Sequence, residues 1–209
     1  MRVAIVGGTG NFGRALASRL RRLEFGVAIG SRDAERAGQL AAIHGVSGGR
    51  NDDVVRGADL VVLAVRSAAA LATARELAEA IDRTPLLCVA SDLRFTEDGV
   101  LPGRLGRSLA EEVADVVSAP VAAGLQTLAA AHLVALDPPE EDVLVCGDEL
   151  AAKEPSLELA ARLVAGRAID AGPLANARAL EGLTAIILNV NRRYGGYAGV
   201  RLTGIPWKE

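Results

Sequence analysis

A short apolar run that leads directly into a cluster of glycines is the feature that most constrains the fold of this chain. The first twenty residues are MRVAIVGGTGNFGRALASRL. Residues 3–6 have the continuous apolar character of a strand buried on both faces, and Ala15, Leu16 and Leu20 then recur at helical spacing. A sharp strand-to-helix turn needs residues without a Cβ where the backbone takes a positive φ or approaches a ligand. The pattern therefore predicts a β-strand, a tight glycine turn and an α-helix.

The glycine turn also fits a dinucleotide-binding fingerprint. Residues 8–13 are Gly-Thr-Gly-Asn-Phe-Gly, which matches the pattern G-x-G-x-x-G. In this motif a pyrophosphate binds at the helix N-terminus, where free N–H groups and the positive end of the helix dipole stabilise negative charge. The motif alone is weak evidence, but here it lies between a predicted strand and a predicted helix, which is the context it requires. We interpret it as a nucleotide site rather than an ordinary glycine-rich turn.

Strand-like and helical segments alternate along the rest of the chain. Strands are predicted at residues 27–30, 60–65, 86–90, 116–118, 143–145 and 168–170, and helices at residues 34–43, 70–81 and 176–193. Residues 108–111, Ser-Leu-Ala-Glu, have the pattern of a capping box and predict a further helix start. This alternation predicts an α/β fold, a Rossmann-type, doubly wound, mostly parallel sheet with a small C-terminal lobe. The stretch LDPPEED (136–142) suggests a boundary between a nucleotide-binding part at 1–137 and a lobe at 138–209. The two parts can also form one compact domain.

Composition narrows the class of protein. Half of the 209 residues are hydrophobic but only 3% are aromatic, so Ala, Val, Leu and Ile must form the core, as is usual around a buried parallel sheet. The net charge of −3 argues against a nucleic-acid surface, although a local cationic patch remains compatible with 23 basic residues. No apolar run reaches the ~20 residues of a membrane span, and the first strand begins at residue 2. We therefore expect a cytoplasmic protein that binds neither membrane nor nucleic acid.

The cysteines and histidines indicate no metal or redox site. Cys88 and Cys146 each lie inside an apolar run, which favours buried, inert thiols. His44 and His132 have no cysteine or acidic partner at the spacing of metal ligands. We therefore expect no metal.

The end of the second predicted strand indicates which dinucleotide binds. NAD-binding proteins generally place Asp or Glu there, to accept hydrogen bonds from the ribose hydroxyls. This chain has Ser31 and Arg32, with Arg36 one helical turn later. A hydroxyl and two guanidiniums would bind a 2′-phosphate, to which Thr9 could add a second hydroxyl, whereas Asp33 fits better as a helix N-cap. The alternative is that both arginines are solvated surface charges. We favour the interpretation that they bind the 2′-phosphate of NADP.

Four segments resemble one family of enzymes. MRVAIVGGTGNFGRALA, IGSRDAERA, VCGDELAAKE and DAGPLANARALEGLTAIILNVN are similar to the F420-dependent NADP reductases, which pass a hydride between NADP and the deazaflavin coenzyme F420. The resemblance spans nearly the whole chain. It implies that Thr9, Ser31, Arg32 and Arg36 hold the 2′-phosphate of NADP, that F420 is the co-substrate, and that the protein is a homodimer.

Two sets of candidate binding residues follow. The expected cofactor-binding residues are Gly8, Thr9, Gly10, Asn11, Phe12, Gly13, Ser31, Arg32, Arg36 and Val65. The expected substrate-binding residues are Arg66, Gln126, Asn176, Arg178, Asn189, Gly199 and Val200. No residue is assigned as a catalytic acid or base, because hydride transfer directly between two cofactors requires only binding and orientation from the protein.

Some of the substrate candidates have a second interpretation. Asn176, Arg178 and Asn189 are either polar groups of the pocket or helix-cap and surface groups. The basic segment at residues 191–201 either binds an anionic ligand or complements the dipole at a helix end closed by Gly195.

The chain departs from the family pattern in two places. Residues 66–69 are Arg-Ser-Ala-Ala where the family typically has Pro-Trp-x-His, and residues 126–129 are Gln-Thr-Leu-Ala in place of His-Thr-Ile-Pro. Small residues predict a wider pocket there, and Arg66 either binds an anion or pairs with Asp92 or Glu97. Two other functions therefore stay open: an NADPH-dependent reductase of another flavin, a metal chelate or a small molecule, and a non-catalytic NADP-binding redox sensor. The length and the C-terminal motif disfavour the sensor.

Overall fold

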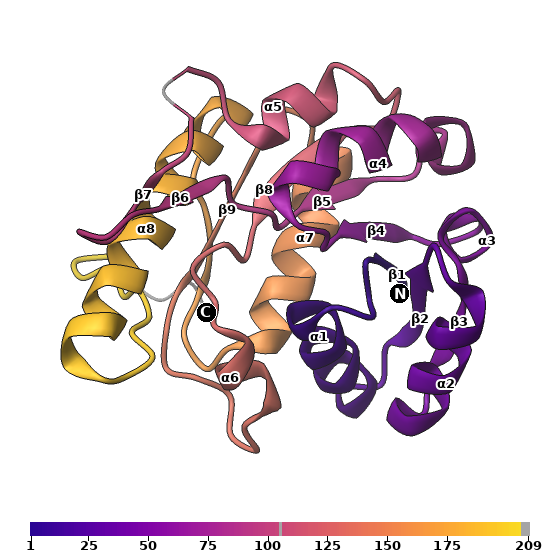
Figure 1. Cartoon of the computed structure of the whole chain (residues 1–209), viewed down its shortest axis with the longest axis horizontal. Coiled ribbons are helices and arrows are strands. Elements are labelled where there is room, and N and C mark those ends of the chain that lie inside the picture. The colour runs from indigo at the N-terminus through magenta and orange to yellow at the C-terminus, as the bar shows by residue number, and fades with distance from the viewer. Residues whose placement is uncertain (105, 206–209) are drawn as a thin grey trace.

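The computed structural model, which describes residues 1–104 and 106–205, is organised around one eight-stranded sheet (Figure 1). The strand order is β10-β9-β8-β5-β4-β1-β2-β3, and a separate antiparallel hairpin pairs β6 with β7. The strands are β1 (Arg2–Val6), β2 (Gly26–Ser31), β3 (Ser47–Arg50), β4 (Leu60–Leu63), β5 (Leu86–Cys88), β6 (Leu93–Phe95), β7 (Val100–Pro102), β8 (Val121–Gly124), β9 (Val143–Gly147) and β10 (Ala168–Asp170). The predicted Rossmann-type, mostly parallel sheet is confirmed.

Helices cover both faces of the sheet, and each face has its own apolar cluster. One cluster joins the sheet to α1 (Asn11–Arg22), α2 (Ala34–His44), α6 (Ala130–Val134) and α7 (Leu150–Leu163). The other joins it to α3 (Asn51–Val55), α4 (Ser67–Ile81), α5 (Leu109–Ala114), the 3-10 helix η1 (Leu174–Asn176) and the start of α8 (Ala177–Tyr194). Burial on both faces explains why β1 and β4 are continuous apolar runs rather than alternating ones.

The direction of the strands changes once. The parallel pairs are β1 with β2, β2 with β3, β1 with β4, β4 with β5, and β5 with β8. The carboxyl ends of these six strands therefore meet at one edge of the sheet. β9 runs antiparallel to β8, and β10 runs parallel to β9. The sheet thus continues past residue 138, and α8 lies beside the β6–β7 hairpin (Figure 1). The division at 137/138 stays a prediction.

One predicted strand is wrong. The structure has no strand at residues 116–118, and the strand of this region is β8, which begins at Val121. Val116 and Val117 instead follow the end of α5 and pack, half-buried, against the apolar cluster of α4 and α5. Their apolar character therefore reflects packing of a loop, which a run of three residues cannot distinguish from a short buried strand.

The predicted helix ends are confirmed. Asp33 is the N-cap of α2, where its Oδ1 accepts the N–H of Arg36 at 3.0 Å. Ser108 and Glu111 form a capping box at the start of α5. Gly195 ends α8 in the left-handed conformation, with φ of 69°. Each side-chain cap contributes about 1 kcal/mol by satisfying N–H groups that the helix itself leaves open. In the described part of the chain, no helix is both long and apolar enough to cross a membrane.

Candidate functional site

The turn between β1 and α1 has no room for side chains. Gly7 has φ of 81°, and a Cβ there would lie 2.7 Å from Val65 Cγ1. A Cβ on Gly13 would lie 2.7 Å from the Cα of Gly8 and 2.8 Å from the carbonyl oxygen of Gly7. The start of α1 therefore packs directly against the turn, and Val65 from the end of β4 covers it. Glycine is required here by close approach of the backbone.

The first turn of α1 is suited to an anion. Its N-cap is Gly10, which offers no side-chain oxygen to the helix N–H groups, and the first turn carries no acidic residue. Asn11 is exposed and Phe12 half-buried at the same end. Open N–H groups and the positive end of the helix dipole both favour a phosphate. The residues present therefore fit the pyrophosphate of a dinucleotide.

The end of β2 carries the expected cationic group. Ser31 ends β2, Arg32 follows it, and Arg36 lies on the first turn of α2, so the structure brings all three to one corner of the sheet. The Ser31 hydroxyl accepts the N–H of Asp33 at 3.2 Å. Both guanidiniums are exposed, and neither forms an ion pair within residues 1–104 and 106–205. Their charge is thus available to a ligand phosphate.

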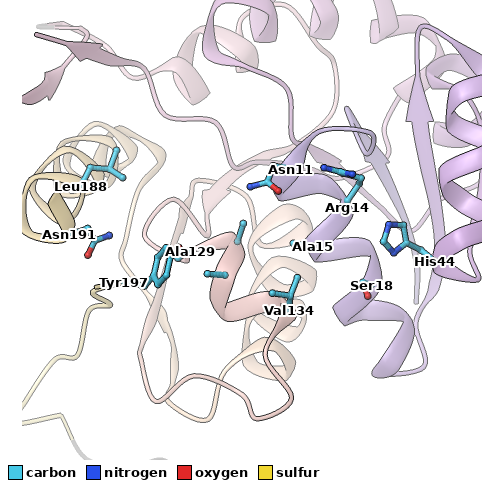
Figure 2. Close-up of a pocket in the computed structure, with 12 residues that line it drawn as sticks. Asn11, Arg14, Ala15, Ser18, His44, Ala129, Val134, Leu188, Asn191 and Tyr197 are labelled. Atoms are coloured by element: carbon cyan, nitrogen blue, oxygen red, sulfur yellow. The ribbon is translucent and has the colours of Figure 1, made fainter. Parts of the chain in front are cut away.

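A cavity of about 610 Å³ opens beside the glycine turn. Figure 2 shows Asn11 and Arg14 of α1 on one side of it, Ala129 and Val134 of the α6 segment in the middle, and Tyr197 with its neighbours from α8 on the other. The lining is largely apolar. The size and character are those of a site for an organic ligand of moderate size.

Two arginines of α1 hold α6 in place as a wall of this cavity. Arg19 is buried, and its Nη1 donates to the carbonyl oxygen of Leu136 at 3.1 Å. Arg22 Nη2 donates to the carbonyl oxygen of Leu133 at 2.9 Å. These carbonyl oxygens lie in and just after the last turn of α6, where the helix has no following N–H groups to bind them. Charged donors there fix a helix of only five residues against α1.

Gln126 lies deep at the carboxyl edge of the sheet. It directly follows Leu125, which has a positive φ of 67°, and it is 8% exposed. Its Nε2 donates to the carbonyl oxygen of Cys88, the last residue of β5, at 3.2 Å. Its Oε1 is buried and has no hydrogen-bond partner within the described residues. An unpaired buried acceptor is costly, so this oxygen is suited to a donor from a ligand.

Polar side chains of α8 form hydrogen bonds with the loops at the carboxyl edge of the sheet. The buried Glu181 accepts the N–H of Leu109 at 2.8 Å and that of Asp92 at 3.2 Å. One turn later, the Thr184 hydroxyl lies 3.0 Å from the carbonyl oxygen of Gln126. Burial raises the pKa of Glu181 above its ordinary value, while the two N–H donors act in the opposite direction. α8 therefore fixes the loops that follow β5 and β8.

Three of the expected substrate residues lie away from the cavity beside the glycine turn. Asn176 and Arg178 line a separate hollow of about 430 Å³ next to Pro102 and Arg104. The amide of Asn189 both accepts the N–H of Val100 at 2.9 Å and donates to its carbonyl oxygen at 2.7 Å. Asn189 thus holds the hairpin on α8. A substrate role for these three side chains stays a prediction.

Arg66 is exposed at the N-cap position of α4, on the same edge of the sheet as the glycine turn. Of the two carboxylates considered as partners, Asp92 pairs with Arg104 at 2.7 Å instead. No ion pair joins Arg66 to Asp92 or Glu97 in the described part of the chain. The guanidinium is therefore open to an anionic ligand.

The segment with Gly199 and Val200 is anchored by buried acids. The N–H of Asp142 donates to the carbonyl oxygen of Val200 at 2.7 Å, and the Asp142 carboxylate accepts the N–H of Leu202 at 2.8 Å. Arg167 Nη2 lies 2.6 Å from Asp142 Oδ2, and its hydrogen bonds hold the pKa of Asp142 down at about 2. Gly199 and Val200 line a hollow of about 450 Å³ behind the main cavity.

Several residues that line the main cavity were missed by sequence reasoning, among them Arg14, Leu188, Asn191 and Tyr197. The Nε of Arg14 is buried without a hydrogen-bond partner among the described residues, which places a cation on the α1 side. Arg14 could have been found, because it follows the glycine motif directly in the helix. The other three reach the cavity only through the position of α8.

The two cysteines are free thiols buried in the sheet. Burial raises the pKa of each thiol to about 12, so neither forms a thiolate at neutral pH. The prediction of buried thiols is confirmed.

The parallel sheet and the Cβ-free turn after β1 define a Rossmann-type protein. A family described as NADP oxidoreductase, coenzyme F420-dependent, matches residues 2–90. The F420-dependent NADP reductase of Methanothermobacter thermautotrophicus is 33% identical over 100% of this chain and 97% of its own length. That of Methanocaldococcus jannaschii is 32% identical over 98% and 99%. The chain belongs to the F420-dependent NADP reductase family.

Solved structures agree with this assignment. A crystal structure from an Arthrobacter species, provisionally described as an F420-dependent NADP reductase, superposes with a TM-score of 0.86 at 27% identity. It covers 97% of this chain and 99% of that one. An imine reductase from Streptomyces aurantiacus superposes with a TM-score of 0.63 at 20% identity, over 92% of this chain and 61% of that one, and shares the fold alone.

Proposed function

We propose that this protein transfers a hydride between NADP(H) and coenzyme F420. The observation that carries the proposal is similarity over the full chain to F420-dependent NADP reductases, combined with a glycine turn that fits a dinucleotide. When both cofactors are bound they supply the chemistry: a hydride passes between C4 of the nicotinamide and C5 of the deazaflavin, with a solvent proton completing the reduced deazaflavin. The residues of the chain bind and orient the two rings.

The proposed roles follow from position in the structure. The first turn of α1 would hold the pyrophosphate, and Ser31, Arg32 and Arg36 would hold the 2′-phosphate that distinguishes NADP from NAD. F420 would occupy the 610 Å³ cavity on the other side of the turn, where its planar ring meets an apolar lining. Arg14 and Arg66 supply cations for its anionic tail. No side chain is assigned as acid or base, because the hydride passes directly between the two rings.

The test uses the purified protein with NADPH and F420. We expect F420 absorbance to disappear in proportion to NADPH oxidised, and NADH to be a much poorer donor. A protein that binds NADPH but neither binds nor reduces F420 would be the reductase of another acceptor, such as a flavin. A protein that binds NADPH but does not oxidise it with any of the acceptors tried would be a redox sensor. Either result rejects the proposal.

We propose that the protein is a homodimer and that the two copies meet through α8 and the β6–β7 hairpin. Four apolar side chains of these elements are exposed, namely Phe95 (73%), Leu101 (43%), Ile186 (59%) and Val190 (38%). Exposed apolar patches of this kind are typical of protein interfaces, and a twofold contact can pair the same patch on both copies. Light scattering should give the mass of a dimer, and Ile186→Glu should give a monomer. A monomeric unmodified protein would reject this proposal.

The proposed location is the cytoplasm. Two free thiols in a chain of this size are compatible with a reducing compartment. Fractionation of the source cells, with the protein followed by antibody, tests the location, and recovery outside the cytoplasmic fraction would reject it.

A further inference from the structure

The far wall of the main cavity carries a single exposed aromatic ring. Tyr197 is 66% exposed although its ring is apolar, and it lines the cavity together with Asn11 at the glycine turn. Among the described residues that line this cavity it is the only Phe, Tyr or Trp, in a chain with 3% aromatic residues. Figure 2 shows the ring beside Ala129, on the side of the cavity opposite α1. An uncovered aromatic face at this place is suited to a planar ligand.

The backbone that follows Tyr197 is held by residues of other elements. The N–H of Ala198 donates to Asn191 Oδ1 on α8 at 2.6 Å. The carbonyl oxygen of Val200 and the N–H of Leu202 are both bound by Asp142, which precedes β9. Because this segment has no regular secondary structure, these bonds set its course. The ring is therefore presented by a fixed segment of chain.

A half-buried histidine and a buried glutamate orient the ring itself. The edge of His132 meets Tyr197 with a centroid distance of 6.1 Å and an interplanar angle of 72°. His132 Nδ1 lies 2.7 Å from Glu141 Oε1, and the Glu141 side chain is only 5% exposed. A Cβ on Gly199 would lie 2.1 Å from Glu141 Oε2, so the segment after Tyr197 passes directly over the carboxylate. Edge-to-face contact with a ring that is itself hydrogen-bonded restrains the rotation of Tyr197.

We propose that Tyr197 is the surface on which the planar ring of the second substrate packs, and that His132, held by Glu141, is a positioning residue that keeps Tyr197 in place. This inference rests on the proposed function, since it concerns the same hydride acceptor. It names a specificity element for planar heteroaromatic acceptors in a cavity whose other lining residues are mainly small or aliphatic. Stacking on an aromatic side chain contributes about 1–3 kcal/mol for a nucleobase, which is a ring of comparable kind.

The experiment compares affinities for F420 and NADPH in six versions of the full chain: the unmodified protein, four single variants and one double variant. Tyr197→Ala should raise the Kd for F420 roughly 5- to 150-fold, while Tyr197→Phe should change it less than about twofold, because the ring and not the hydroxyl does the packing. Tyr194→Ala is the matched control, an exposed tyrosine (76%) three residues earlier that does not line the cavity. Tyr194→Ala should bind F420 as the unmodified protein does, and NADPH binding should be unchanged throughout.

The fifth version tests the positioning role. His132→Gln keeps a donor for Glu141 but removes the ring, so it should raise the KM for F420 about threefold with little change in kcat or in the KM for NADPH. In the double variant with Tyr197→Ala it should add nothing, because a residue that acts through Tyr197 has no effect once that ring is gone. Additive losses would overturn the positioning role.

Unchanged F420 affinity in Tyr197→Ala, or an equal loss of NADPH affinity, would overturn the stacking role. These failures are distinguishable from failure of the proposed function. If the unmodified protein neither binds nor reduces F420, the proposed function is wrong and this inference falls with it. If the unmodified protein reduces F420 and the alanine variant does so equally well, only this inference is wrong.

Discussion

The glycine turn and the far wall lie on opposite sides of a cavity of about 610 Å³, and they are built in different ways. The turn is one continuous stretch, residues 7–13, whose shape follows from missing side chains and from backbone packing on β1 and β4. The far wall is lined by Asn191 and Tyr197, and outside this lining His132, held by Glu141, contacts Tyr197. These residues meet only because α8 and the last segment return to the sheet.

This difference separates the two tasks of the protein. A phosphate-binding turn made of backbone N–H groups depends on few side chains, so it tolerates change elsewhere in the molecule. A wall made of long-range side-chain contacts can be altered residue by residue without disturbing the turn. The departures at residues 66–69 and 126–129 lie on the same edge of the sheet and outside the turn. The molecule can therefore vary its second substrate while its dinucleotide site is maintained.

The largest effect should come from filling the turn. Gly13→Ala places a Cβ 2.7 Å from the Cα of Gly8, which only movement of the backbone can relieve. We expect NADPH affinity to fall more than about 100-fold, because the pyrophosphate loses several hydrogen bonds at once. Titration of NADPH fluorescence measures this. Gly38→Ala, in α2 with no atom within 4 Å of the new Cβ, is the control and should bind normally. A Gly13→Ala protein that binds within threefold would contradict the proposed site.

Loss of one cation should separate NADP from NAD. Arg32→Ala removes a charge-assisted contact worth about 1.5–3 kcal/mol, so the Kd for NADP should rise roughly 10- to 150-fold while that for NAD hardly changes. Arg75→Ala, another exposed arginine, on α4, serves as control. Equal losses for the two nucleotides would show that Arg32 does not meet the 2′-phosphate. Tighter binding of NAD than NADP by the unmodified protein would reject that assignment directly.

Breaking the anchor of the far wall should lower stability but spare the turn. Asp142→Asn removes the charge that Arg167 and the N–H of Leu202 bind, and we expect the free energy of unfolding to fall by about 2 kcal/mol. Urea titration measures this loss, and NADPH affinity should remain within about twofold. A large loss of NADPH affinity would show that the two regions are not independent.

The same carboxylate predicts a dependence on pH. Hydrogen bonds from Arg167 lower the pKa of Asp142 from 3.8 to about 2 in the folded protein. A lowered folded-state pKa means that this contribution is present above pH 3.8 and is lost as the pH falls toward 2. The stability of the unmodified protein should therefore fall more steeply than that of Asp142→Asn across this interval. Parallel curves would contradict the assignment.

The smallest effect should come from Arg66. Because this exposed guanidinium would meet a flexible anionic tail rather than a phosphate held in one place, the contact is worth at most about 1 kcal/mol, or roughly a fivefold change. Arg66→Ala should raise the KM for F420 by up to that factor and leave the KM for NADP alone. Steady-state kinetics in 50 mM and 500 mM salt would confirm a charge effect if the difference shrinks at high salt. No difference at low salt would assign Arg66 to a solvated helix start.

The sequence was sufficient for the parts that depend on local pattern. The turn, the strand that precedes it, the N-cap at Asp33 and the capping box at Ser108 all follow from neighbouring residues, and the structure has each of them. The strand expected at 116–118 failed because a run of three residues, two of them apolar, is too short to show a period. The antiparallel course of β9 and the meeting of His132 with Glu141 and Tyr197 depend on contacts between distant segments, which no local pattern contains.

The central claim is that two rings exchange a hydride directly across the cavity between the glycine turn and Tyr197. The most direct measurement uses NADPH carrying deuterium at the transferred C4 position, with unlabelled F420 in ordinary water. The account predicts that the label appears at C5 of the reduced F420 in single turnover, from one face of the nicotinamide only. Deuterium found in water, or no transfer to F420 in a protein that still binds NADPH, would contradict it.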